Sequence, residues 1–191
     1  MSSEHFALFD TAIGRCAIAW TGHGVCGVQL PERHAEATRD RLCRRFPDAV
    51  ETSPDGAVQR AIDGIVALLR GEVRDLAFVT LDMAGIPPHR QSIYQLLRGI
   101  PPGRTRSYGE IATGLGAALT ARDVGEAMGK NPFPIIVPCH RVVGTGGRIG
   151  GFSANGGVAT KLRLLNIEQA EIGTPPALFD ALPLAVRPRR R

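Results

Sequence analysis

Several features of membrane, secreted and metal-binding proteins are missing from this sequence of 191 residues. No apolar run approaches the ~18 residues that a membrane-spanning helix needs. The N-terminal stretch MSSEHFALFD has no basic segment followed by an apolar one, so we expect no signal peptide. The four cysteines are irregularly spaced and form no C-x-x-C pair, which excludes a zinc ribbon and a thioredoxin motif. We therefore expect a cytoplasmic protein without disulfides, metal or cofactor.

Lysine is also scarce, because Lys130 and Lys161 are the two lysines among 23 basic residues. The net charge of +5 and the isoelectric point of about 9.5 permit a nucleic-acid partner without requiring one. Cys16, Cys26 and Cys43 lie in strand-like or helical runs, and we interpret them as small buried apolar residues. The length allows one compact domain or two small ones.

Residues 1–83 have the pattern of a small α/β module. The turn-forming spacers DTAIG and TGHG separate three apolar runs, which predicts a three-stranded meander. Two helical patterns follow, with a loop at 47–56 between them, and Gly71 is suited to cap the second helix. We expect strands over 5–9, 15–20, 25–30 and 76–83, and helices over 31–46 and 57–72.

From residue 84 the pattern changes to helices joined by short loops. Ser107 with Glu110, and Thr120 with Asp123, have the spacing of N-terminal capping boxes. Two short helices joined by a tight turn that contains glycine are typical of a helix-turn-helix. The sequence therefore predicts helices that begin at Tyr108 and at about residue 119.

The remaining segments complete the predicted α/β fold. We expect a helix over 91–100, a glycine-rich loop or hairpin over 144–152, and a closing helix over 158–170 with Leu162 and Leu165 facing the core. The chain thus divides into an α/β module (1–83), a mainly helical domain (84–171) and a proline-rich basic tail (172–191). Within that tail, the segment ALFDAL is apolar enough to dock on the surface.

The stretch NPFPIIVPCHRVVG, residues 131–144, contains the candidate catalytic residues Cys139 and His140. A thiol reacts as the thiolate, and its free pKa near 8.5 leaves it mostly protonated at neutral pH. A base must therefore take the proton of Cys139. Because Pro138 fixes the preceding backbone, a bend there brings His140 to the same site as Cys139. His140 then accepts the proton directly or through a water, and an acidic residue behind it would orient the imidazole.

Several motifs in this half, in the same order, resemble those of the O6-alkylguanine-DNA alkyltransferases. These proteins are also called methylated-DNA–protein-cysteine methyltransferases. The motifs are SYGEIA, TARDVGEAMGKNP, NPFPIIV with PCHRVVG, and a later K..LL..E, over roughly residues 86–171. The resemblance implies a ribonuclease-H-like sheet module before a helical DNA-binding domain. It also implies direct DNA repair, in which the protein accepts an alkyl group once and then stops.

The resemblance assigns catalytic roles. Cys139 would accept the alkyl group, and His140 would deprotonate it through a water while Glu168 holds His140. Asn131 would be the hinge residue that forms hydrogen bonds around the cysteine. Tyr108 would lie by the phosphate of the rotated nucleotide and donate a proton to the leaving guanine. Lys161 would assist the transfer.

The resemblance also implies a DNA surface and a substrate pocket. Helix 119–131 would lie in the minor groove of double-stranded DNA that carries O6-alkylguanine. Arg122 would occupy the place that the flipped base vacates. Other expected DNA contacts are Tyr108, Thr120, Ala121, Gly125, Lys130 and Arg141. The expected pocket residues are Pro138, Phe152 and Ser153. A monomer is expected, which associates with the nucleoid through DNA.

The sequence departs from the family pattern in three places. Phe152 stands where a tyrosine is usual, and the segment 153–160 is two residues longer, which alters the predicted pocket around Ser153 and the range of alkyl groups that it accepts. Asp123 follows Arg122 where a small apolar residue is common. No N-terminal zinc site is evident.

Three other functions are compatible with parts of the sequence. A non-catalytic relative would recognise lesions without repairing them, although such relatives lack the cysteine. A helix-turn-helix regulator would account for 107–131 and leave Cys139 and His140 unexplained. A cysteine hydrolase would need an oxyanion-hole motif, which the sequence does not offer.

Overall fold

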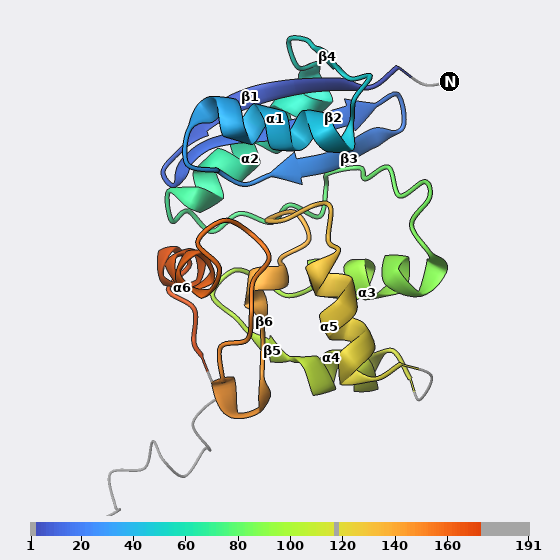
Figure 1. Cartoon of the computed structure of the whole chain (residues 1–191). Helices are drawn as coiled ribbons and strands as arrows, with labels where there is room; N and C mark the ends of the chain where they lie inside the picture. The colour runs from blue at the N-terminus through green and yellow to red at the C-terminus, as the bar shows by residue number, and fades with distance from the viewer. Residues whose placement is uncertain (1–2, 117–118, 173–191) are drawn as a thin grey trace, which may run out of the picture.

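The computed structural model describes residues 3–116 and 119–172. A small sheet with a helix on each face forms the N-terminal half, and the C-terminal half is mainly helical (Figure 1). The fold is thus a mixed α/β fold with a small sheet and six α-helices among the described residues. No helix in this part of the chain is long and apolar enough to cross a membrane.

The sheet begins with the predicted meander. β1 (His5–Thr11), β2 (Gly14–Thr21) and β3 (Gly24–Gln29) pair antiparallel. β4 (Val50–Glu51) pairs parallel with β1, which gives the order β3-β2-β1-β4. Gly24 has a φ of +133°, and a Cβ atom there would lie 2.6 Å from the Thr80 carbonyl oxygen, so only glycine fits this turn.

Helices cover the two faces of the sheet. Because side chains alternate along a strand, Phe6, Ala17 and Ala19 pack against Leu42 of α1 (Ala35–Arg45). The opposite face, which includes Ile18, packs in the main core with residues of α2 (Gly56–Leu69). Asp55 caps α2, and Gly71, with a φ of +93°, follows its end as predicted.

Two sequence-based predictions for this half are wrong. Segment 76–83 forms no strand and instead makes a single bridge between Leu81 and Val25. The Arg98 side chain donates to the carbonyl oxygens of Leu76, Ala77 and Val79, which stabilises a turn in place of a sheet edge. The segment 47–56, expected to be a loop, contains β4 because Val50 pairs with His5.

The C-terminal half confirms the two capping boxes. Ser107 and Glu110 cap α4, and Thr120 and Asp123 cap α5, each pair with both reciprocal hydrogen bonds. The α-helices of this half are α3 (Pro88–Arg98), α4 (Tyr108–Gly114), α5 (Ala121–Gly129) and α6 (Val158–Ile167). The short strands are β5 (Arg106–Ser107) and β6 (Val142–Val143), which pair parallel.

Of two further expectations, one is met and one needs correction. Segment 144–152 forms the loop and not the hairpin, with a short 3-10 helix, η2 (Thr145–Gly147), within it. In α6, Leu165 is buried as expected, but Leu162 is exposed and Leu164 takes the second core position. The tail 173–191, including ALFDAL, lies outside the described residues.

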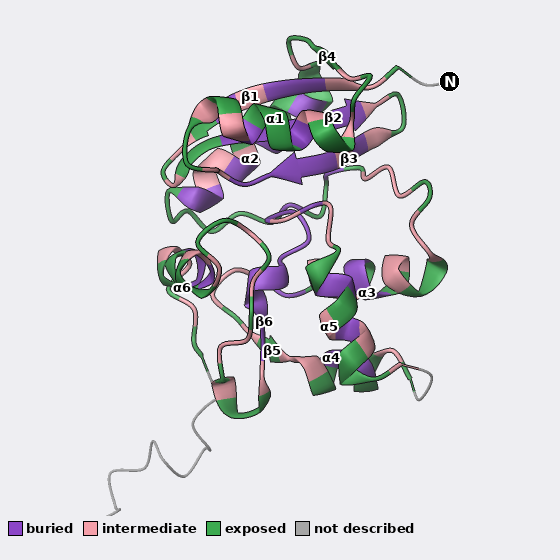
Figure 2. Cartoon of the chain, in the orientation of Figure 1, coloured by how far each residue is buried: buried purple, intermediate pink, exposed green. Residues whose placement is uncertain are grey.

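A single hydrophobic cluster joins the two halves. It includes Trp20 and Val28 of the sheet together with Ile93 and Phe133 of the C-terminal half. The buried residues of Figure 2 accordingly lie in both halves. The Val28 amide also donates to the Pro132 carbonyl oxygen at 2.8 Å. This contact connects the sheet with the segment that leads to Cys139.

Candidate active site

A tightly held turn presents Cys139. The Asn131 side-chain amide donates to the Val137 carbonyl oxygen, and its Oδ1 accepts from the Phe133 amide, both at 2.9 Å. Ile135 within this turn has a φ of +75°, which is strained for a β-branched residue. After Pro138, the chain enters the 3-10 helix η1 (Cys139–Arg141). Asn131 therefore holds the backbone that carries the cysteine.

His140 and Glu168 form a buried pair. His140 Nε2 lies 2.9 Å from Glu168 Oε1, and both side chains are almost fully buried. Although burial raises the pKa of Glu168, hydrogen bonds from His140 and Arg141 bring it down to about 2. The carboxylate can only accept, so Nε2 carries the hydrogen of this bond. Burial lowers the pKa of His140 against the opposing effect of Glu168, which favours the neutral imidazole.

The buried side chain of Arg141 completes this hydrogen-bond network. Its Nε and Nη2 donate to the two oxygens of Glu168, and its Nη1 donates to the Ile100 carbonyl oxygen. The side chain is 6% exposed. The prediction that Arg141 contacts DNA is therefore not supported, because its guanidinium is committed to Glu168. Arg163, which precedes Glu168 by five residues, donates instead to the carbonyl oxygens of Ala12 and Ile13.

The environment of Cys139 combines burial with stabilising contacts. Burial raises the pKa of the thiol, while a hydrogen bond with Asn131 and the charge of Lys161 oppose that rise. His140 Nδ1 is buried and has no hydrogen-bond partner among the described residues. A neutral imidazole whose Nδ1 is bare can accept a proton. Cys139 and His140 therefore offer a nucleophile and a base on one turn.

Lys161 is fully buried, which the sequence alone would not indicate. Its Nζ donates to the Val142 carbonyl oxygen at 2.5 Å and lies 6.0 Å from the ring centroid of Tyr108. Burial lowers the pKa of Lys161 and raises that of Tyr108. Tyr108 thus keeps its phenolic proton at neutral pH and remains a donor.

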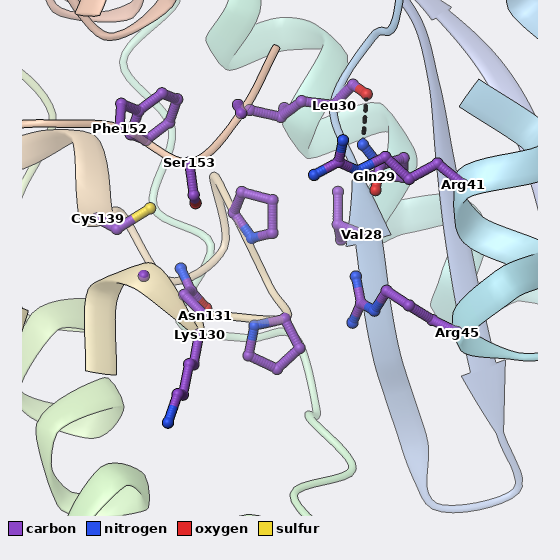
Figure 3. A pocket seen from close by; sticks show the side chains of 14 residues that line it. Val28, Gln29, Leu30, Arg41, Arg45, Lys130, Asn131, Cys139, Phe152 and Ser153 are labelled. Carbon is purple, nitrogen blue, oxygen red and sulfur yellow. Dashed lines mark hydrogen bonds between the residues drawn. The ribbon is translucent and has the colours of Figure 1, made fainter. Parts of the chain in front are cut away.

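Two cavities reach Cys139. One, of about 320 Å³, is lined by Tyr108, Gly125, Met128, Phe152 and Ser153. The second, of about 250 Å³, extends from Cys139 to β3 and α1 (Figure 3). Phe152 and Ser153 line both cavities, as expected of pocket residues. Pro138 lines neither cavity, and it directly precedes the 3-10 helix η1 that contains Cys139.

The predicted DNA contacts lie mainly on α5. Thr120, Ala121 and Arg122 are exposed at its N-terminal end. Lys130, at the other end, pairs with Glu126 at 2.7 Å. Gly125 faces Tyr108, whose ring a Cβ atom at Gly125 would meet at 4.0 Å. Over residues 3–116 and 119–172, no cluster of His, Cys, Asp and Glu could hold a metal ion.

Comparisons with known proteins identify the family of the chain. The family model of the 6-O-methylguanine DNA methyltransferase DNA binding domain matches residues 88–170. The methylated-DNA–protein-cysteine methyltransferase of Mycobacterium tuberculosis (strain ATCC 25618 / H37Rv) is 39% identical over 177 residues, covering 92% of this chain and 99% of that protein. That of Methanothermobacter thermautotrophicus is 31% identical, covering 79% of this chain and 77% of that protein.

The structural comparison extends to a DNA complex. The crystal structure of Mycobacterium tuberculosis OGT in complex with DNA matches with a TM-score of 0.69 and 35% identity, covering 86% of this chain and 92% of that one. The chain belongs to the methylated-DNA–protein-cysteine methyltransferase family. Its function is direct-reversal DNA repair, and its partner is DNA.

Proposed function

We propose that the chain flips O6-alkylguanine out of double-stranded DNA and transfers the alkyl group irreversibly to Cys139. The observation that carries this proposal is the position of Cys139 between a cavity beside Tyr108 and a buried His140–Glu168 pair. A buried thiol next to a base, with room for a planar ligand in front, suits attack on an alkyl carbon. Flipping is needed because the O6 atom lies inside the duplex.

Each group near Cys139 has a part in the transfer. His140 Nδ1 takes the thiol proton, directly or through a water, and the Glu168 carboxylate stabilises the resulting imidazolium. The sulfur–carbon bond forms as the carbon–O6 bond breaks, and the electron pair of that bond passes to guanine. Tyr108 donates a proton to the leaving guanine. Lys161 stabilises the thiolate before attack, because its charge favours the ionised sulfur.

The product explains why the protein would work once. A thioether at Cys139 offers water no carbonyl to attack, in contrast to an acyl-enzyme. A cycle that returns the free thiol would require a second nucleophile able to displace a thiolate from carbon.

The DNA surface of the proposal is the exposed face of α4 and α5, as a helix-turn-helix. α5 would enter the minor groove, and Arg122 would fill the place of the flipped base. Thr120 and Ala121 lie beside it, and the small Gly125 permits close approach of the backbone. Asp123 Oδ2 accepts hydrogen bonds from the backbone amide and the hydroxyl of Thr120, and these bonds hold its carboxylate against its own helix.

The proposal also includes the domain organisation of the whole chain. A ribonuclease-H-like module over 1–83 precedes the DNA-binding and alkyl-acceptor domain over 84–171, and the tail 172–191 is basic. The protein would act as a monomer in the cytoplasm, associated with the nucleoid.

A single-turnover assay with Cys139→Ser tests the proposal. Duplex DNA with labelled O6-methylguanine is mixed with excess protein, and loss of label from DNA is followed. Wild-type protein and Cys43→Ser, whose thiol lies on α1 against the sheet, should remove the label. Cys139→Ser should bind the duplex and leave the label on DNA. Removal of the label by Cys139→Ser would overturn the proposal.

A further inference from the structure

The proposed function gives the guanine base a place on one side of Cys139 and leaves a second cavity, between Cys139 and the N-terminal module, without a role. The base side of Cys139 is the cavity lined by Tyr108 and α5. The second cavity of about 250 Å³ leads from Cys139 in another direction, to the end of β3 and to α1. Because one water occupies about 30 Å³ of liquid, this space has room for a chain of several atoms.

The wall of this cavity contains both polar and apolar side chains. Asn131 and Ser153 lie beside Cys139, and the apolar side chains are those of Val28, Leu30, Pro132, Pro134, Phe152 and Ala154. Figure 3 shows the sulfur of Cys139 pointing into the cavity between Phe152 and Asn131. An alkyl substituent on the reacting carbon that extends past Asn131 and Ser153 would therefore contact apolar side chains of the cavity.

The far side of the cavity is cationic. Arg41 and Arg45 belong to α1, and Figure 3 shows both guanidinium groups reaching past β3 towards the site. Lys130 also lines the cavity, but its ammonium pairs with Glu126. Gln29 carries no charge, and its amide nitrogen donates to the Leu30 carbonyl oxygen and to Glu32.

The two arginines differ in how their charge is compensated. Arg41 pairs with Glu32 at 3.2 Å. Arg45 stacks on the ring of Phe46, with 5.1 Å from Cζ to the centroid, and has no carboxylate partner among the described residues. The cavity therefore ends at one cation whose charge is available to a ligand.

We propose that this cavity receives the distal part of long O6-alkyl adducts and that Arg45 selects adducts ending in an anionic group. The inference rests on the proposed function, because the adduct reaches the cavity only from guanine held at Cys139. The covalent step is unchanged: the sulfur bonds to the first carbon of the adduct, and the carbon–O6 bond breaks. The carboxylate end reacts with nothing and pairs with the guanidinium.

The test compares two isosteric adducts in duplex DNA, O6-(3-carboxypropyl)guanine and O6-(3-carbamoylpropyl)guanine, with O6-methylguanine as reference. Single-turnover rates are measured for wild type, Arg45→Ala, Arg45→Glu and the control Arg44→Ala, whose side chain is exposed on α1 outside the cavity. Wild type and Arg44→Ala should prefer the carboxylate over the amide by on the order of fivefold. Arg45→Ala should lose the preference, and Arg45→Glu should reverse it.

A second variant tests the space itself. Ala154 lines the cavity and is partly buried, so Ala154→Phe should slow transfer of both long adducts while methyl transfer persists. Equal rates for the two long adducts in wild type would overturn the inference. So would an Arg45→Ala variant that slows all three adducts alike and binds duplex more weakly, because Arg45 would then contact the DNA backbone. Absence of methyl transfer in wild type would instead overturn the proposed function.

Discussion

At the scale of single residues, the carboxylate of Glu168 holds the site together because it is the counter-ion of the buried Arg141 and the hydrogen-bond acceptor of the buried His140. His140 and Arg141 both donate to it, and Gly103 contributes its backbone amide at 3.5 Å. Removing one member of a buried ion pair leaves an uncompensated charge, which typically costs about 3–5 kcal/mol. Glu168 therefore supports both the fold and the orientation of the base.

Glu168→Gln should destabilise the protein and change its response to acid. The pKa of Glu168 falls from 4.5 to about 2 on folding, which corresponds to about 3 kcal/mol of stability. Since the folded-state pKa is the lower one, this stability is complete above pH 4.5 and is lost as the pH falls towards 2. Urea unfolding at several pH values should show this loss in wild type and a smaller one in Glu168→Gln.

The control for this experiment is Glu171→Gln, which changes an exposed carboxylate paired with Arg104. Exposed pairs contribute about 0–1 kcal/mol, so this variant should unfold almost as wild type does at pH 7. Equal stability of Glu168→Gln and wild type at pH 7 would contradict the role of Glu168 as a counter-ion.

The sequence predicts the candidate reactive residues, but it does not predict the contacts that hold them. Cys139 and His140 are adjacent, and the motif pattern nominates Asn131, Tyr108 and Glu168. The burial of Lys161 could not be anticipated, because it depends on how α6 packs against β6. Arg141 was predicted to contact DNA, and its burial could not be anticipated either, because its partner Glu168 lies 27 residues away in the chain.

At the scale of elements, two capping boxes define where the two helices of the proposed DNA surface begin. The Thr120 hydroxyl accepts from the Asp123 amide, and Asp123 Oδ2 accepts from the Thr120 amide at 2.7 Å. These bonds satisfy amide groups that a helix start otherwise leaves unpaired. The cap therefore fixes the backbone on which Ala121 and Arg122 stand.

Thr120→Ala should cost about 1 kcal/mol of stability, because an alanine at the N-cap accepts no hydrogen bond. It should also weaken duplex binding, since α5 would fray where Arg122 lies. Thr120→Ser should retain both properties. Denaturant unfolding and fluorescence anisotropy with a labelled duplex measure the two effects. The account of α5 fails if Thr120→Ala behaves like Thr80→Ala, a change at an exposed residue of the N-terminal module outside the proposed DNA surface.

Local patterns predicted the helices well because caps and prolines act locally. They failed for 76–83, whose apolar residues suit a strand, because Arg98 from α3 binds its carbonyl groups. They also missed β4, whose two residues are defined by pairing with β1. In both cases, a partner far away in the sequence decides the structure.

At the scale of the whole molecule, the sheet module and the helical domain share one core. The composition change at residue 84 predicted two units, and nothing in the sequence indicated how much apolar surface they bury against each other. Ile93 and Phe133 lie in the same cluster as Trp20. The site depends on this contact, because Val28 of β3 binds Pro132 in the turn before Cys139.

We expect the described part of the chain to unfold in a single cooperative transition. Trp20, the only tryptophan in the sequence, reports on the sheet by fluorescence, and hydrogen exchange of peptides from α6 reports on the helical domain. Because the core is shared, the two probes should give the same midpoint in urea. Separate midpoints would show that residues 1–83 and 84–171 fold independently.

The most direct test of the central claim is the mass of the protein after reaction with excess duplex that contains O6-methylguanine. Intact-mass analysis followed by peptide mapping should find one added methyl group per chain, on the peptide that contains Cys139. A second addition of duplex should add nothing more. A methyl group on Cys16, Cys26 or Cys43, or repair of several duplexes per chain by unmodified protein, would contradict irreversible transfer to Cys139.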